Sequence, residues 1–103
     1  MTIPPASSEA LARARAAAVE VRQRRSEVKD AIRARRMSVG EALDLSEVDD
    51  VVAHIRVYEL LKAVPRVGDK RANEIMERHG IADGRRLRGL GKHQIAGLKA
   101  EFE

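Results

Sequence analysis

The sequence predicts an all-α protein in which a long N-terminal helix precedes a small helical domain. Apolar residues recur at spacings of three, four and seven along the first third of the chain, as on one face of a helix. Later segments begin at capping residues and end at proline or glycine. No stretch alternates with period two over a useful length. Tyr58 and Phe102 are the only aromatic residues, so the core must be built from Leu, Ile, Val and Ala.

The N-terminal region divides into a tail and a basic helix. Residues 1–6 contain two prolines and are predicted to be a flexible tail. Residues 7–36 are predicted to be a basic helical arm, with Ser7 or Ser8 as its N-cap. The apolar stripe along one face of this helix is narrow and alanine-rich, and Arg25 interrupts it. Much of the arm should therefore project into solvent. A coiled-coil pairing remains an alternative, but we expect a monomer in solution. The stripe consists of Leu11, Ala14, Ala18, Val21, Val28 and Ile32.

Residues 37–103 are predicted to form the helical domain. Ser38 and Glu41 have the spacing of a capping box and open a short helix that runs through Leu45. Ser46 with Asp49 resembles a second cap before another short helical segment. The helix after that one carries the apolar residues Val57, Leu60, Leu61 and Val64, and Pro65 stops it.

The last third of the chain is predicted to hold two helices and two turns. Residues 65–69 form a turn, and a helix over residues 70–79 is closed by Gly80. Residues 81–91 are non-repetitive and rich in Gly and Arg. The final helix covers residues 92–102. The residues expected to face the core in these two helices are Ala72, Ile75, Met76, Ile95, Leu98 and Phe102.

The charge is segregated along the chain, whose net charge is +4. Nine Arg and Lys residues against three acids lie between Arg13 and Arg36, and ten against four lie between Lys62 and Lys99. Five acids and no base occupy residues 41–50. Basic blocks of this kind attract polyanions. The acidic segment either repels nucleic acid or forms a solvated face folded against the basic arm, and we favour the second reading.

Several function classes are excluded on composition. The chain has no cysteine, and its three histidines lack ligand spacing, so we expect no metal and no cofactor. No nucleophile–base set, carboxylate pair or phosphate-loop signature is present, so we expect no enzymatic activity. The N-terminus lacks a charged and apolar leader, and no apolar run reaches the ~20 residues that span a bilayer. We expect a soluble cytoplasmic protein that does not contact a membrane.

The sequence VPRVG predicts a phosphate-binding turn. Pro65 fixes one backbone angle, and Gly68 is expected to adopt a conformation that side chains forbid. The N–H groups of Val67 and Gly68 and of the next helical turn should then point outward, as in other phosphate sites at helix N-termini. The basic residues expected around them are Arg66, Lys70 and Arg71. An ordinary helical corner is the alternative.

The sequence RRLRGLG, residues 85–91, predicts a second contact. Leu87 and Leu90 should anchor it in the core, while Gly89 and Gly91 allow a tight turn or a close approach to a phosphate. Arginine suits both bidentate phosphate contacts and a narrow minor groove. We expect both turns to lie on one side of the molecule and to hold one duplex. The residues that project from this second turn are Arg85, Arg86 and Arg88, with Lys92 adding charge.

The pattern L-L-x-x-V-P-x-V-G-x-x-x-A-x-x-I resembles the helix–hairpin–helix of DNA-binding proteins. Together with RRLRGLG it resembles the helix-two-turns-helix module, at about residues 57–102. Bacterial small-subunit ribosomal proteins, formamidopyrimidine-DNA glycosylases and actinobacterial integration host factors share that module. The resemblance to the integration host factors covers nearly the whole chain, from "RSEVKDAIR" through "VYELLKAVPRVGDKRANEIMERHGI" to "RRLRGLGKHQIAGLKAEF".

The resemblance implies a nucleoid-associated protein that binds duplex DNA with little sequence preference, bends or compacts it, and assists phage integration. Asp69 departs from the lysine common in the family, which puts a side-chain phosphate contact there in doubt. A glycosylase is excluded because its N-terminal amine nucleophile and zinc finger have no counterpart. Two alternatives stay open: a ribosomal RNA-binding protein, and an interaction module whose arm docks on an acidic partner.

The basic arm should make secondary contacts with the same duplex or with a second one. It carries far more cations than the acids in the same stretch can pair. The arm residues expected to contact DNA are Arg22, Arg25, Lys29, Arg33 and Arg36.

Overall fold

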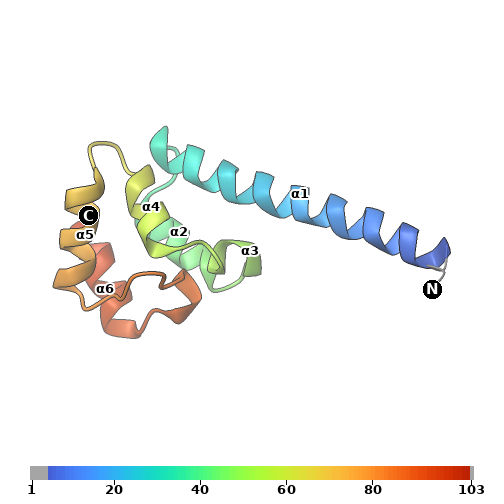
Figure 1. Ribbon diagram of the computed structural model, residues 1–103. Coiled ribbons are helices and arrows are strands. Elements are labelled where there is room, and N and C mark those ends of the chain that lie inside the picture. Colours follow the sequence, from blue (N-terminus) through green and yellow to red (C-terminus); the bar gives the residue numbers. More distant parts are fainter. Residues whose placement is uncertain (1–4, 103) are drawn as a thin grey trace.

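The computed structural model describes residues 5–102, and side chains from residue 8 onward. Within that range it is all-helical, as predicted, and its only β-type pairing is an isolated bridge between Arg56 and Arg86. The helices pack into a small domain from which the first helix extends (Figure 1). In order they are α1 (Pro5–Arg33), α2 (Val39–Ser46), α3 (Asp50–Ala53), α4 (Val57–Ala63), α5 (Asp69–Arg78), the 3-10 helix η1 (Leu87–Gly89) and α6 (Lys92–Glu101).

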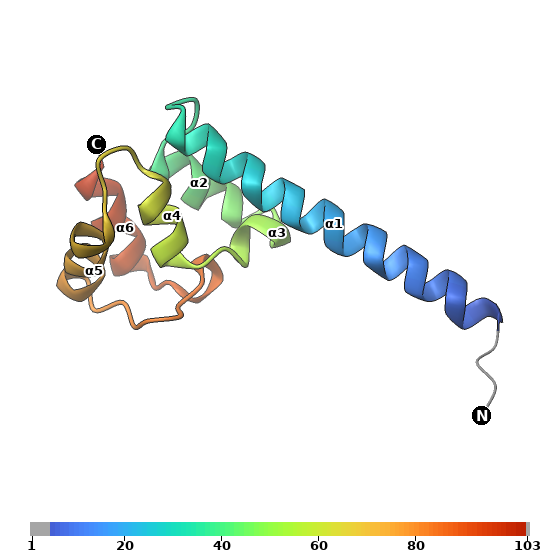
Figure 2. The same cartoon turned by 45° about the horizontal axis from the view of Figure 1, so that its top comes forward.

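Helix α1 begins at Pro5, two or three residues before the predicted start at Ser7 or Ser8. Proline fits the first position of a helix because its missing N–H would be unpaired there. Residues 1–4 of the predicted tail lie outside the described residues. Only the last turns of α1 are packed, through Val28 and Ile32, whereas Leu11 is 54% and Val19 42% exposed. Figures 1 and 2 show the rest of the helix extending away from the domain, which confirms that the arm projects into solvent.

The connections around α2 and α3 are set by local hydrogen bonds. The predicted capping box is confirmed: Ser38 Oγ accepts from the Glu41 N–H at 3.0 Å, and Glu41 Oε1 accepts from the Ser38 N–H at 3.1 Å. The predicted cap at Ser46 is wrong. Asp49 caps α3 by accepting from the Val51 N–H at 3.0 Å, while the Ser46 hydroxyl donates to the Leu43 carbonyl within its own helix.

The C-terminal helices have nearly the predicted bounds. Helix α4 ends before Pro65, and α5 is followed by Gly80, whose φ of 64° matches its predicted role as the helix stop. Of the residues expected to face the core, four are buried: Ala72, Ile75, Met76 and Leu98. Ile95 and Phe102 are partly exposed and pack against the same core. One hydrophobic core therefore joins α4, α5 and α6 to α2, α3 and the end of α1.

The acidic segment, residues 41–50, contacts the arm, as we predicted from the sequence. Arg24 Nε donates to Asp49 Oδ2 at 2.8 Å, and this bond holds the pKa of Asp49 below its usual value. Asp44 instead pairs with Lys99 of α6 at 2.6 Å. These contacts tie the acidic helices to the arm and to α6.

Candidate nucleic-acid interface

The turn between α4 and α5 is built differently from the prediction. Gly68 has an ordinary φ of −93°, and the residue in the left-handed region is Arg66, with φ of 70°. Val67 is buried, and its N–H donates to the Val64 carbonyl at 3.1 Å, so it is not a free donor. The left-handed conformation at Arg66 turns the chain so that the Val67 side chain enters the core.

The free donors of this turn begin one residue later than predicted. The first hydrogen bond of α5 runs from the Ala72 N–H to the Gly68 carbonyl, at 2.9 Å. Over the described residues, the N–H groups of Gly68, Asp69, Lys70 and Arg71 have no protein acceptor. Arg66, Lys70 and Arg71 are exposed beside them. The start of α5 thus combines unpaired donors, a positive helix end and three cations, all of which favour an anion.

An acid also lies at this helix start. The carboxylate of Asp69, the first residue of α5, accepts from Lys62 Nζ at 2.6 Å and from the hydroxyl of Tyr58. The hydrogen bonds from Lys62 and Tyr58 lower the pKa of Asp69, and the bond to Asp69 raises the pKa of Tyr58. Asp69 therefore stays ionised, and its negative charge opposes phosphate binding at the same end of the helix.

Residues 85–91, here called the arginine loop, are fixed to the segment before α4. The Val57 N–H donates to the Arg85 carbonyl at 2.9 Å, and the Leu87 N–H donates to the Ile55 carbonyl at 3.0 Å. Leu87 is buried and Leu90 packs partly against the core, as predicted. The loop is thus held in place by two main-chain hydrogen bonds to residues 55–57 and by the packing of Leu87 and Leu90.

The three arginine side chains of the arginine loop are not equally free to bind a ligand. Arg85 Nη1 donates to the Gly89 carbonyl at 2.7 Å and Arg88 Nη1 lies 3.1 Å from His54 Nε2, and both side chains are exposed. Arg86 is half-buried, and its Nη1 donates to the His54 carbonyl at 2.6 Å. The expectation that all three project freely is therefore wrong for Arg86, whose guanidinium is used to close the loop.

The two glycines of the arginine loop, Gly89 and Gly91, have different structural roles. Neither has a positive φ; the glycines that do are Gly80 and Gly84. A Cβ at Gly89 would lie 2.8 Å from Arg85 Cδ, so this glycine leaves room for the Arg85 side chain. Gly91 is the N-cap of α6, and its N–H donates to Gln94 Oε1 at 2.9 Å. That N–H is already used, although the adjacent Lys92 is exposed.

The turn between α4 and α5 and the arginine loop do not adjoin (Figures 1 and 2). Along the chain they are separated by α5 and by residues 79–84, and the loop is bonded to Ile55 and Val57. The expectation that both turns lie on one side of the molecule and hold one duplex stays a prediction.

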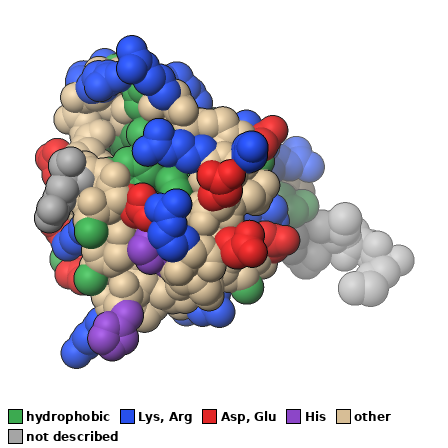
Figure 3. Space-filling view, turned by 90° about the vertical axis from the view of Figure 1, so that its left-hand side faces the viewer, with side chains coloured by type: hydrophobic (Ala, Val, Ile, Leu, Met, Phe, Trp, Pro, Cys, Tyr) green, Lys and Arg blue, Asp and Glu red, His purple; other side chains and the backbone are tan. Residues whose placement is uncertain are grey.

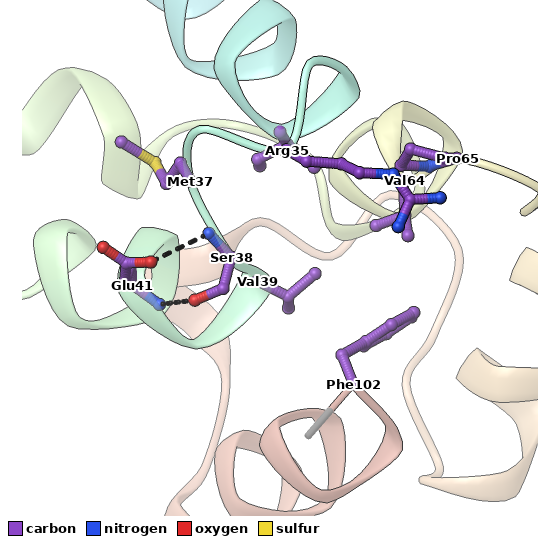
Figure 4. A pocket seen from close by; sticks show the side chains of 9 residues that line it. Arg35, Met37, Ser38, Val39, Glu41, Val64, Pro65 and Phe102 are labelled. Carbon is purple, nitrogen blue, oxygen red and sulfur yellow. Dashed lines mark hydrogen bonds between the residues drawn. The ribbon is translucent and has the colours of Figure 1, made fainter.

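The end of the arm lies beside the turn between α4 and α5. A groove lined by Ile32, Met37, Val64, Pro65 and Phe102 joins them, and Arg35 extends across it toward Val64 and Pro65 (Figure 4). Figure 3 shows basic side chains along the upper edge of this face, where α1 ends. Arg35, like Arg66, has a positive φ, of 62°. The junction thus adds cations of the arm to those of the turn.

The predicted arm contacts differ in how much of their charge is already paired. Arg33 pairs with Asp30 at 2.7 Å, and Lys29 lies 4.0 Å from Glu59. Arg25 is half-buried. Arg22 and Arg36 are exposed and have no ion pair with any described residue.

Two other kinds of site are absent from the described residues. No cluster of three or more His, Asp or Glu side chains there has metal-binding geometry. None of the helices is both long and apolar enough to cross a bilayer.

The chain resembles known proteins along nearly its whole length. Residues 32–102 match the family model described as the S13-like H2TH domain. The chain is 41% identical to the integration host factor of Streptomyces coelicolor and 37% identical to that of Mycobacterium tuberculosis; the alignments cover 99% of this chain and 95% and 97% of those proteins. The chain belongs to the integration host factor family. That assignment confirms the resemblance and the helix-two-turns-helix fold expected from the sequence.

A solved structure agrees with the family assignment. The structure of sIHF bound to an 8bp palindromic DNA superposes with a TM-score of 0.81 at 42% identity, covering 84% of this chain and 97% of that one. The sequence missed His54 and Lys62 as parts of the candidate interface. His54 lies outside the quoted motifs and Lys62 stands at a variable position of one, and the bonds that connect them to the interface form only through the tertiary fold.

Proposed function

We propose that this member of the integration host factor family is a nucleoid-associated protein that binds double-stranded DNA with low sequence specificity and bends it. The observation that carries the proposal is the start of α5, where unpaired N–H groups are surrounded by Arg66, Lys70 and Arg71. A family relative solved with bound DNA supports DNA as the ligand.

Low specificity follows from the kind of groups available. Backbone N–H groups, arginines and lysines bind phosphates, and such contacts position a protein on the duplex without reading bases. Asn73 is the one exposed amide side chain on α5. The exposed Arg85 and Arg88 of the arginine loop would hold other phosphates of the same duplex or enter the minor groove. Contacts at two separated points favour a bent duplex.

Gly68 supports a close approach of the DNA backbone to this turn. Its φ requires no glycine, and a Cβ added there would meet no atom within 4 Å. Gly68 is the N-cap of α5, where glycine is favoured over alanine, and a phosphate against the α5 N-terminus would favour it as well. Gly68→Ala is expected to lower thermal stability slightly and to weaken DNA binding. Unchanged affinity would contradict the close approach.

The arm is proposed to add contacts through Arg22 and Arg36, with Arg25, Lys29 and Arg33 contributing less because they are partly paired or buried. Removing residues 1–36 cannot test this, since Val28 and Ile32 belong to the core. Truncation before residue 21 combined with Arg22→Ala and Arg36→Ala keeps that core. Unchanged affinity and unchanged bend angle in this variant would remove the arm from the interface.

The function is tested by titrating duplex DNA at several salt concentrations. About five neutralised phosphates predict a slope of log affinity against log salt near about −4 to −5. The triple substitution Arg66→Ala, Lys70→Ala and Arg71→Ala should make the slope less negative by about two to three. A wild-type slope weaker than about −2 would contradict the proposal. Tighter binding to structured RNA than to duplex DNA would instead favour the ribosomal reading.

A further inference from the structure

His54 connects the end of α3 to the arginine loop through two separate bonds. Its carbonyl oxygen accepts from Arg86 Nη1 at 2.6 Å, and its ring Nε2 lies 3.1 Å from Arg88 Nη1. The other ring nitrogen, Nδ1, lies 2.6 Å from the Asp50 carbonyl oxygen, one turn earlier in the chain. The half-buried imidazole therefore bridges α3 and the loop, which are more than thirty residues apart in sequence.

The partners fix the tautomer of this imidazole. The Asp50 carbonyl can only accept a hydrogen bond, so Nδ1 must carry the proton. The Arg88 guanidinium can only donate, so Nε2 must offer its lone pair. The arrangement thus requires the neutral ring with the proton on Nδ1. Asp50 holds the ring in the orientation in which it accepts from Arg88.

We propose that His54 is a positioning residue for DNA binding, because its ring holds the exposed guanidinium of Arg88 in place while its carbonyl holds Arg86. This inference rests on the proposed function, in which Arg88 contacts a phosphate. Arg88 has five N–H donors, so donating one bond to His54 leaves the others free for a phosphate.

A side chain held before binding loses less conformational freedom on binding. Immobilising a long side chain at an interface costs about 0.5–1.5 kcal/mol, which corresponds to roughly a two- to twelvefold change in affinity. Arg85 has a comparable arrangement, since its guanidinium bonds to the Gly89 carbonyl within the loop. The loop thus presents two exposed arginines that are both held by protein acceptors.

Two conservative substitutions separate positioning from structural support. In His54→Gln the side-chain oxygen can reach the place of Nε2 and accept from Arg88. In His54→Asn the shorter amide can replace Nδ1–H as the donor to Asp50, but it does not reach Arg88. His54→Ala removes both bonds. We expect His54→Ala and His54→Asn to lower DNA affinity about three- to tenfold, and His54→Gln to restore it to within about twofold.

The opposite order would overturn the inference. If Asn restores binding and Gln does not, His54 only supports the end of α3, and its bond to Arg88 has no role in DNA binding. Equal losses in all three variants at unchanged thermal stability would also contradict the positioning role. Nitrogen chemical shifts of the His54 ring supply an independent readout: the proton should be on Nδ1, and a proton on Nε2 alone would contradict the bond to Arg88.

A double-mutant comparison keeps this inference distinct from the proposed function. Arg88→Ala alone should weaken DNA binding, and adding His54→Ala to it should cause no further loss, because the residue being positioned is gone. If Arg88→Ala has no effect, the proposed contact of the arginine loop fails. If Arg88→Ala weakens binding but His54→Ala does not, the loop contact stands and only the role of His54 is lost.

Discussion

Lys62 Nζ lies 2.6 Å from Asp69 Oδ1, so the first carboxylate of α5 is paired with a lysine of the preceding helix. Two charges at the proposed phosphate site therefore neutralise each other in the free protein. Both side chains are exposed, so solvent screens the pair and it adds little to stability. Its larger effect should be on DNA binding.

Asp69→Asn should increase DNA affinity, because it removes a negative charge near the phosphate and frees Lys62 to bind DNA. We expect a rise of about two- to fivefold at low salt, which shrinks as salt is added. Fluorescence anisotropy with a short duplex measures it. Glu47→Gln, which removes an equal charge from an exposed residue at the end of α2, is the control. Equal effects of the two substitutions would mean that only net charge matters.

Arg66→Gly should separate the fold of the turn from its charge. Arg66 has φ of 70°, a conformation that costs most side chains about 1 kcal/mol or more and glycine almost nothing. Glycine should therefore leave the free energy of unfolding unchanged or raise it by up to about 1 kcal/mol, while DNA affinity falls. Chemical denaturation and DNA titration of the same sample test both effects. Arg66→Ala should lose the same affinity without the gain in stability, and a destabilised Arg66→Gly would contradict this description of the turn.

Gly97→Ala should destabilise the protein, since the new Cβ would lie 2.4 Å from His79 Nδ1 and 2.6 Å from its Cε1. The His79 ring cannot move away freely because its Nε2 is 3.0 Å from Glu101 Oε1. Overpacking of this kind costs about 1–3 kcal/mol, against about 1 kcal/mol gained in helix propensity.

Gly40→Ala is the matched control for that substitution. Gly40 is also within a helix, but an added Cβ would meet Lys99 Cγ and Ser38 Oγ only at 3.8 Å. We expect this variant to be stabilised by about 0.5–1 kcal/mol. A higher melting temperature for Gly97→Ala than for Gly40→Ala would contradict the packing of α6 against the end of α5.

The stabilising effect of Glu101 should depend on pH. Hydrogen bonds from Arg78 and then His79 lower the pKa of Glu101 below its unfolded-state value. A lowered carboxyl pKa stabilises the folded state above the unfolded-state pKa, and this contribution is lost as pH falls through the folded-state pKa. Wild type should therefore exceed Glu101→Gln in free energy of unfolding by at most about 1 kcal/mol above about pH 5. The difference should shrink as pH falls below the unfolded-state pKa and through the folded-state pKa, and a difference that grows with acid would contradict the ion pair.

The elements that the sequence predicted correctly depend on signals within one turn of chain. The capping box at Ser38, the stop at Pro65 and the left-handed Gly80 are all local, and each is confirmed. The positive φ of the turn was assigned to Gly68 by residue type. It belongs to Arg66 because burial of Val67 sets the direction of the turn, and that burial is a tertiary effect.

The candidate site was predictable in composition but not in arrangement. The sequence identified the cations of both turns, whereas the place of the arginine loop depends on its bonds to Ile55 and Val57, far away in sequence. The partial burial of Arg86 and the bonds of His54 to the loop join segments 32 and 34 residues apart, and no local pattern reports them. Asp69 was noted as an unusual acid, but its pairing with Lys62 required the two helices to be placed side by side.

If the start of α5 and the arginine loop contact one duplex at once, backbone amide shifts during a DNA titration test this most directly. The amide signals of Gly68, Asp69 and Lys70 and those of Arg85 and Arg88 should shift together and saturate with a single dissociation constant. Shifts confined to one of these two turns, or two turns that saturate at different DNA concentrations, would contradict a shared duplex.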